Sequence, residues 1–220
     1  MKKIVLLFVA LLVAGCGEKS LSDSAISKAL EEAVETSSLQ KRDGIYYQPN
    51  ESKPYSGWVK MLYDSEQPKA LARLKDGKKD GLYVQWHKNR KKKYEGTYKD
   101  GERDGLYVQW HENGQKGHEA TYKDGGLYGL ATVWYENGKK EAEGIYKDDQ
   151  LNGLATGWHE NGQKWREETH EEGKIISEKY WNSKGEEVAT REESEKSLIP
   201  SRSAWLGSKA LPTLHLILVT

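Results

Sequence analysis

The chain has 220 residues, and its 34 Lys and Arg residues balance its 34 Asp and Glu residues, so the formal net charge is zero. This balance argues against a general nucleic-acid-binding protein, because such proteins carry an excess of positive charge. Only 36% of the residues are hydrophobic, and 8 Trp and 13 Tyr stand against a single Phe. We therefore expect a thin structure, in which each ring has one dry side and one wet edge, rather than a thick aliphatic core.

The first sixteen residues have the layout of an export signal. Two lysines precede the apolar run 4–14, which is too short to span a bilayer as a helix. Val13-Ala14-Gly15-Cys16 resembles the lipobox of bacterial lipoproteins. The resemblance implies that a signal peptide of residues 1–15 is removed and that acylated Cys16 anchors the chain in the lipid bilayer. Gly17, by the same resemblance, favours an outer-membrane location, facing the periplasm or the cell surface. The alternative is an ordinary signal peptide with an incidental cysteine.

Residues 16–43 form the next predicted segment, a linker with a short helix. Apolar residues from Ala25 to Val34 recur at helical spacing and predict an amphipathic helix over about residues 23–36. Ser22 or Asp23 is a suitable N-cap. We interpret this helix as a spacer that also closes the first repeat, because repeat arrays need atypical ends; the alternative is a partner-binding helix.

An internal repeat dominates the middle of the chain. The heptapeptide 81–87 recurs at 105–111, and variants of it begin at Gly129 and Gly153, so each copy starts 24 residues after the last. A fixed period of this size indicates an array built from one small unit. The whole array is predicted to cover residues 44–187.

Each unit has the pattern of a β-hairpin. Leu106 and Val108 alternate with more polar neighbours, and this period of two predicts a strand. Asn113-Gly114 predicts a tight turn, because both residues tolerate a positive φ, and Asp124-Gly125 turns the chain again. The sum is an antiparallel meander of roughly ten to twelve strands, since each period holds two strands of ordinary length.

Two aromatic ladders recur with the same period. We expect them to interleave on one face, where aromatic cross-strand pairs add about 0.2–1 kcal/mol each. Small residues such as Gly96 precede the tyrosines by two positions and leave room for a neighbouring ring. His170 and Glu168 interrupt this pattern, so we expect looser packing near that end. The ladders consist of Trp86, Trp110, Trp134 and Trp158, and of Tyr98, Tyr122 and Tyr146.

The repeating pattern Gly…Trp-x-x-Asn-Gly…Tyr-Lys-Asp-Gly resembles the MORN repeat, in the variant form of the bacterial antitoxin-like MORN-repeat family. The resemblance implies a mainly β fold, a single-layer twisted antiparallel meander. It does not imply one function, since members serve as scaffolds and as membrane-associated modules. An antitoxin role fits an exported lipoprotein poorly, because such a protein would not meet a cytoplasmic toxin.

The candidate catalytic and metal-binding residues have simpler explanations. His87, His111 and His159 each follow a repeat tryptophan, but equivalent strands lie roughly 9–10 Å apart, whereas zinc needs its ligands at about 2 Å. We therefore expect histidines at a solvent edge, with no metal and no cofactor. The aspartates at the turns are explained by turn chemistry. No nucleophile–base signature is recognisable, so we predict no catalytic residue and a protein that is not an enzyme.

The sequence therefore predicts an envelope-anchored, non-enzymatic binding or scaffolding module. Its candidate binding residues are the seven ladder aromatics, and its candidate partner is an envelope protein or a glycan, with no nucleic acid expected. The alternative for the rings is that they pack on one another and on the helix. The alternative functions are a glycan or peptidoglycan hydrolase or its accessory protein, an antitoxin-like protein, and a structural spacer. Residues 188–220 are predicted to be an irregular or disordered tail.

Overall fold

The computed structural model describes residues 22–196. The predicted signal peptide, Cys16 and the tail beyond residue 196 lie outside this range. In chain order the elements are α1 (Asp23–Glu32), β1 (Val34–Glu35), the 3₁₀ turn η1 (Thr36–Ser38), β2 (Gln40–Arg42), β3 (Ile45–Tyr47), β4 (Gly57–Leu62), β5 (Pro68–Lys75), β6 (Lys78–Trp86), β7 (Lys92–Lys99), β8 (Glu102–Trp110), β9 (Lys116–Lys123), β10 (Gly126–Trp134), β11 (Lys140–Lys147), β12 (Gln150–Trp158), β13 (Lys164–Glu171), β14 (Lys174–Trp181), β15 (Glu187–Val188) and α2 (Arg191–Lys196).

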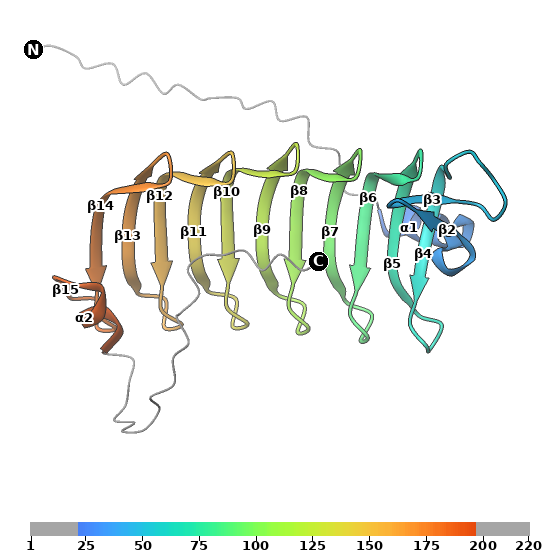
Figure 1. Cartoon of the computed structure of the whole chain (residues 1–220). Helices are drawn as coiled ribbons and strands as arrows, with labels where there is room; N and C mark the ends of the chain where they lie inside the picture. Colours follow the sequence, from blue (N-terminus) through green and yellow to red (C-terminus); the bar gives the residue numbers. More distant parts are fainter. Residues whose placement is uncertain (1–21, 197–220) are drawn as a thin grey trace, which may run out of the picture.

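One long sheet forms the body of the molecule (Figure 1). It has 13 strands: β4 to β15 follow one another in chain order, and β1 is added beside β4. The consecutive strands pair antiparallel, while β1 runs parallel to β4. The predicted fold class, a mainly β single-layer meander of tandem hairpins, is confirmed. Neither helix within residues 22–196 combines the length and apolar character that crossing a membrane requires.

The two kinds of turn differ in geometry. At the Asp-Gly turns both residues have a positive φ, as in Asp124 (48°) and Gly125 (85°), which is the type I′ pattern. At the Asn-Gly turns only the glycine is positive, as in Gly114 (92°). The predicted turn is present, but only its glycine uses the positive φ that both residues tolerate. The Asn113 side chain instead accepts a hydrogen bond from the Gln115 amide (2.9 Å), so it stabilises a longer loop with a bulge at Trp110.

The start and end of α1 follow from local contacts. The Ser22 hydroxyl accepts a hydrogen bond from the Ala25 amide (3.3 Å), as the predicted N-cap should. The helix ends at Glu32, earlier than expected, because Val34 pairs with Val59 and draws the chain into β1.

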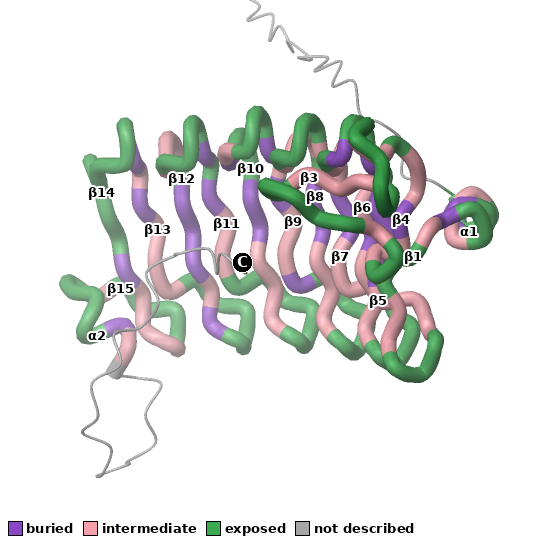
Figure 2. Tube along the Cα trace, turned by 45° about the vertical axis from the view of Figure 1, so that its right-hand side comes forward, coloured by how far each residue is buried: buried purple, intermediate pink, exposed green. Residues whose placement is uncertain are grey.

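Both faces of the sheet are covered at its N-terminal end. On one face α1 buries a cluster of Ile26, Ala29, Ala33, Leu71, Leu82 and Val84. On the other face, side chains from the β2–β3 region pack on a second cluster, formed by Val59, Ala72 and Leu74. Along the rest of the sheet, burial is concentrated within the strands and the turns are exposed (Figure 2). The expectation that α1 closes the first repeat is confirmed.

Candidate functional site

The two aromatic ladders lie on opposite faces of the sheet. Trp110 pairs with Lys116, whereas Tyr122 pairs with Gly105 and lies beside Tyr107. Directly paired residues project to the same face, and successive residues alternate. Tyr122 of β9 therefore shares a face with Gly105 and Tyr107 of β8, whereas Trp110 of β8 projects to the other face. The expectation that the two ladders interleave on one face is wrong. We call the two sides the tryptophan face (Trp86, Trp110, Trp134 and Trp158) and the tyrosine face (Tyr83, Tyr98, Tyr107, Tyr122 and Tyr146).

The tyrosine face is filled by its own side chains. The rings of Tyr107 and Tyr122 meet edge to face with centroids 5.8 Å apart, and Tyr94 stacks on Tyr107 at the same distance. Tyr122 and Tyr146 are buried, and Tyr98 is half-buried. Gly96 leaves space for Tyr107, since a Cβ there would lie 2.6 Å from the ring.

Two cations are inserted between these rings. The Lys79 ammonium lies 4.2 Å from the Tyr83 ring centroid, and the Arg103 guanidinium lies 4.4 Å from that of Tyr107. Arg103 also donates a hydrogen bond to the Tyr122 hydroxyl (3.1 Å). Burial, with the nearby positive charge of Arg103, lowers the pKa of Lys79, and burial raises the pKa of Tyr107. In the next two repeats a leucine takes the place of the cation and an alanine takes the place of the tyrosine, as Leu127 and Ala131 do for Arg103 and Tyr107. The cation–tyrosine pair and the leucine–alanine pair therefore fill the same space in successive repeats.

The C-terminal end of the tyrosine face holds a buried ionic cluster. Glu168 is 5% exposed and His170 is 7% exposed, and their side chains lie 3.0 Å apart. Arg166 donates to the other carboxylate oxygen of Glu168 (3.2 Å). Glu168 is thus paired on both carboxylate oxygens inside the layer, while β14, the next strand, is exposed over most of its length, in keeping with the looser packing expected near this end.

The tryptophan face carries a repeated charged pattern. All four tryptophans are half-buried. A lysine of the preceding repeat lies over the rings of Trp134, Trp158 and Trp181; the Lys140 ammonium, for example, is 5.5 Å from the Trp158 ring centroid. Each of these lysines also pairs with the glutamate three residues later; in one such pair, Lys164 Nζ lies 2.5 Å from Glu167 Oε2. Trp134 and Trp158 are therefore shielded by lysine side chains rather than presented as a bare platform.

A row of exposed leucines runs beside this pattern. Leu82 is 9% exposed because α1 covers it, whereas its repeat equivalents Leu106, Leu130 and Leu154 are 54%, 53% and 46% exposed. Ile145 pairs with Leu130 and is 42% exposed. We call these four exposed residues the leucine row. None of the four was among the seven predicted binding residues. The sequence did contain a signal for the three leucines, because a leucine follows the repeat glycine in each of these units.

The residue after each repeat tryptophan joins neighbouring repeats. His111 Nε2 lies 2.9 Å from the Trp134 carbonyl oxygen, and the Tyr135 hydroxyl donates to the Trp158 carbonyl (2.7 Å). His159 is only 4% exposed. The expectation of solvent-edge histidines is therefore wrong, since His159 is buried and the side chains of His87, His111 and Tyr135 each reach a backbone carbonyl of the next repeat. Within residues 22–196, no group of three or more His, Cys, Asp or Glu residues is placed to hold a metal ion.

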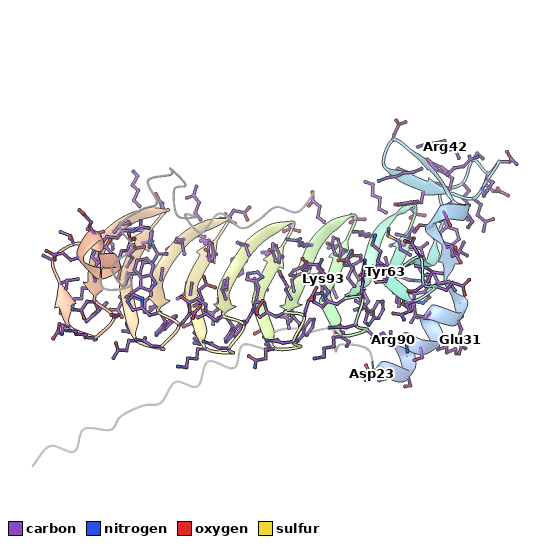
Figure 3. The ribbon with its side chains drawn as sticks, turned by 90° about the horizontal axis from the view of Figure 1, so that it is seen from below. Asp23, Glu31, Arg42, Tyr63, Arg90 and Lys93 are labelled. Atoms are coloured by element: carbon purple, nitrogen blue, oxygen red, sulfur yellow. The ribbon has the colours of Figure 1, made fainter. Side chains whose placement is uncertain are left out.

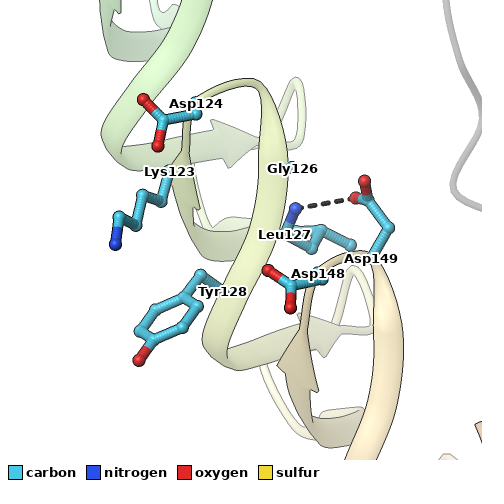
Figure 4. A pocket seen from close by; sticks show the side chains of 7 residues that line it. All are labelled: Lys123, Asp124, Gly126, Leu127, Tyr128, Asp148 and Asp149. Carbon is cyan, nitrogen blue, oxygen red and sulfur yellow. Dashed lines mark hydrogen bonds between the residues drawn. The ribbon is translucent and has the colours of Figure 1, made fainter. Parts of the chain in front are cut away.

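A shallow pocket of about 280 Å³ lies among the Asp-Gly turns (Figure 4). Asp124 and Asp148 line it and are exposed. Asp149 accepts a hydrogen bond from the Leu127 amide (2.7 Å), so its carboxylate stabilises the turn. A second pocket of about 570 Å³, lined by residues that include Leu30 and Lys60, lies between α1 and the first strands.

The structure thus divides the seven predicted binding residues between two faces and leaves the leucine row as an exposed apolar feature. Residues 103–124, 127–148 and 151–172 match the family described as the MORN repeat variant. These segments correspond to three successive hairpin units within β8–β13 and begin 24 residues apart. A comparison with curated proteins gives no match.

Proposed function

We propose that this chain, with its tandem MORN repeat variants in a single sheet, is a non-enzymatic binding module held at the cell envelope. Acylated Cys16 would supply the anchor, and the tryptophan face between β8 and β13 would supply the binding surface. The lipobox-like residues support the anchor, and an exposed apolar feature on an otherwise charged sheet supports the surface.

The leucine row carries this proposal. Its leucines are about half exposed, although the chain buries the equivalent Leu82. The opposite face offers less, because its rings and cations already fill one another's gaps. A surface that the fold does not need for its own core is available for a partner.

The binding experiment compares two variants with matched exposure. Tagged full chain is cross-linked in envelope fractions as wild type, as Leu130→Ser/Leu154→Ser, and as Ile175→Ser. Ile175 is 50% exposed but pairs with His170 on the tyrosine face. We expect the double variant to lose its cross-linked partners and Ile175→Ser to keep them. Unchanged cross-links in the double variant would place the binding surface elsewhere.

The anchor has a separate test. Metabolic labelling with a fatty-acid analogue should label the wild-type chain and should fail to label Cys16→Ser. Because the sheet lies outside the signal, both proteins should show the same β-rich circular dichroism. Equal labelling of the two proteins would remove the lipoprotein part of the proposal.

A further inference from the structure

The first repeat shows what kind of element covers the tryptophan face. α1 lies across the strands there; Figure 3 labels Asp23, its first residue, and Glu31, which lies next to its last residue. Its N-terminal carboxylate on Asp23 lies 3.9 Å from the Lys92 ammonium of β7. Near its C-terminal end, Lys60 of β4 donates to the Leu30 carbonyl (3.2 Å). The helix N-terminus therefore points along the sheet toward the leucine row.

We propose that the leucine row binds an amphipathic α-helix of a partner protein, laid across the strands in line with α1. This inference rests on the proposed function, since it names the partner of the same surface. Leu82 under α1 and Leu106 beside it belong to identical heptapeptides, yet one is 9% and the other 54% exposed. The helix that covers the first is the template for the occupant of the others.

The spacing of the leucines suits a helix. Successive leucines lie two strands apart, which is about 9.6 Å at the usual strand separation. Seven residues of an α-helix rise about 10.5 Å. A helix with an apolar residue at every seventh position would therefore contact Leu106, Leu130 and Leu154 in turn, with a drift of only about 1 Å per repeat.

Exposed lysines border the leucine row on one side and lysine–glutamate pairs border it on the other. On the side of the Asp-Gly turns lie the exposed lysines Lys99, Lys123 and Lys147. On the other side lie Glu119, Glu143 and Glu167, and each of these glutamates is already paired with the lysine three residues before it. Figure 4 shows Lys123 and Tyr128 on the same side of the sheet, and the ammonium lies 5.7 Å from that ring. The fitting helix therefore carries acidic residues along the flank that faces the exposed lysines.

A second copy of the chain fits this surface less well. Two packed sheets lie about 10 Å apart, and a helix with its side chains is about 10–12 Å wide, so α1 already fills that layer beside the leucine row. A copy lying in register would meet α1. A copy turned end to end would place the row of exposed lysines opposite its own counterpart, which is a repulsive arrangement.

The test uses a synthetic 21-residue peptide of three heptads, with leucines as the apolar stripe, glutamates on one flank and lysines on the other. Its fluorescence anisotropy is titrated with the full chain. We expect saturable binding to wild type, about tenfold weaker binding to Leu130→Ser/Leu154→Ser, and a change below about twofold for Ile175→Ser. Lys123→Glu/Lys147→Glu should also weaken binding, and a peptide with lysines on both flanks should restore it.

Two outcomes would overturn the inference. One is the absence of saturable binding to wild type, or equal weakening by the leucine and isoleucine variants. The other is a dimer of the full chain in sedimentation that the leucine variants dissociate, because the occupant would then be a second copy. If envelope cross-links depend on the leucine row while the peptide does not bind, only the helical partner is rejected and the proposed function stands.

Discussion

Gly96→Ala tests how tightly the tyrosine face is packed. The new methyl group would lie 2.6 Å from Cδ2 of Tyr107 and 3.4 Å from the Leu106 carbonyl oxygen. Tyr107 is 7% exposed and cannot move aside easily, because Tyr94 and Tyr122 lie 5.8 Å from it by ring centroid. The φ of Gly96 lies outside the left-handed region, so alanine meets a steric obstacle and no backbone strain.

The expected loss follows from two opposing effects. Overpacking of a well-filled core costs about 1–3 kcal/mol. Replacing glycine by alanine recovers about 0.4–1 kcal/mol by reducing the freedom of the unfolded chain. The free energy of unfolding should therefore fall by about 1–2 kcal/mol, which lowers the melting temperature by about 2–8 °C for a chain of this size.

Urea unfolding followed by circular dichroism measures this loss, and a double-mutant cycle with Tyr107→Ala identifies its cause. Without the ring the methyl group fits, so Gly96→Ala should be neutral or slightly stabilising in the Tyr107→Ala background. Gly144→Ala, at the equivalent repeat position, is the control, because its Cβ would meet the movable end of Leu151 (2.8 Å). Equal costs of Gly96→Ala in both backgrounds would refute the reasoning.

Three further predictions follow from matched positions. Leu82→Ser should cost about 2–3 kcal/mol in urea unfolding because α1 buries Leu82, whereas Leu106→Ser should change stability by less than about 0.5 kcal/mol; equal costs would show that the leucine row is structural. Glu168→Ala should lower the free energy of unfolding by about 3–5 kcal/mol, because it leaves Arg166 and His170 unpaired. The control Glu167→Ala breaks an exposed pair with Lys164 and should lower it by at most about 1 kcal/mol. A loss for Glu168→Ala no larger than that of the control would contradict the buried cluster. Burial raises the pKa of the Tyr135 hydroxyl from its ordinary value near 10 to about 12, so the stability that the protonated hydroxyl contributes is complete below pH 10 and is lost as the pH rises through 12. The urea midpoint of the wild type should therefore fall more steeply from pH 9 to 12 than that of Tyr135→Phe. Identical slopes for the two proteins would count against a raised pKa at Tyr135.

The period and the alternation of side chains were sufficient to predict the hairpins and the single sheet. They also contained the face assignment. An Asn-Gly turn at 113–114 implies a register that pairs Gly105 with Tyr122, and the same rule places Trp110 on the other side. The wrong prediction that the ladders share a face therefore came from using the alternation of side chains within each strand without using the turn to set the register between the two strands.

The exposure of the leucine row could not be predicted in this way. The heptapeptides 81–87 and 105–111 are identical, yet Leu82 is buried and Leu106 is exposed. The difference arises from α1, which is distant in the chain and covers only the first repeat. The role of His111 was equally hidden, because its partner is a backbone carbonyl 23 residues away and carries no side-chain signature.

The bonds that join one hairpin to the next are the same at successive junctions. Gly125 donates its amide proton to the Arg103 carbonyl (3.0 Å) at one edge, and Asn113 donates from its side chain to the Glu136 carbonyl (2.7 Å) at the other. Because each junction involves adjacent units only, gain or loss of one 24-residue unit would leave the remaining junctions intact. Such a change would alter the reach of the molecule by about 9.6 Å, two strand widths, so duplication of a short gene segment is enough to adjust its length.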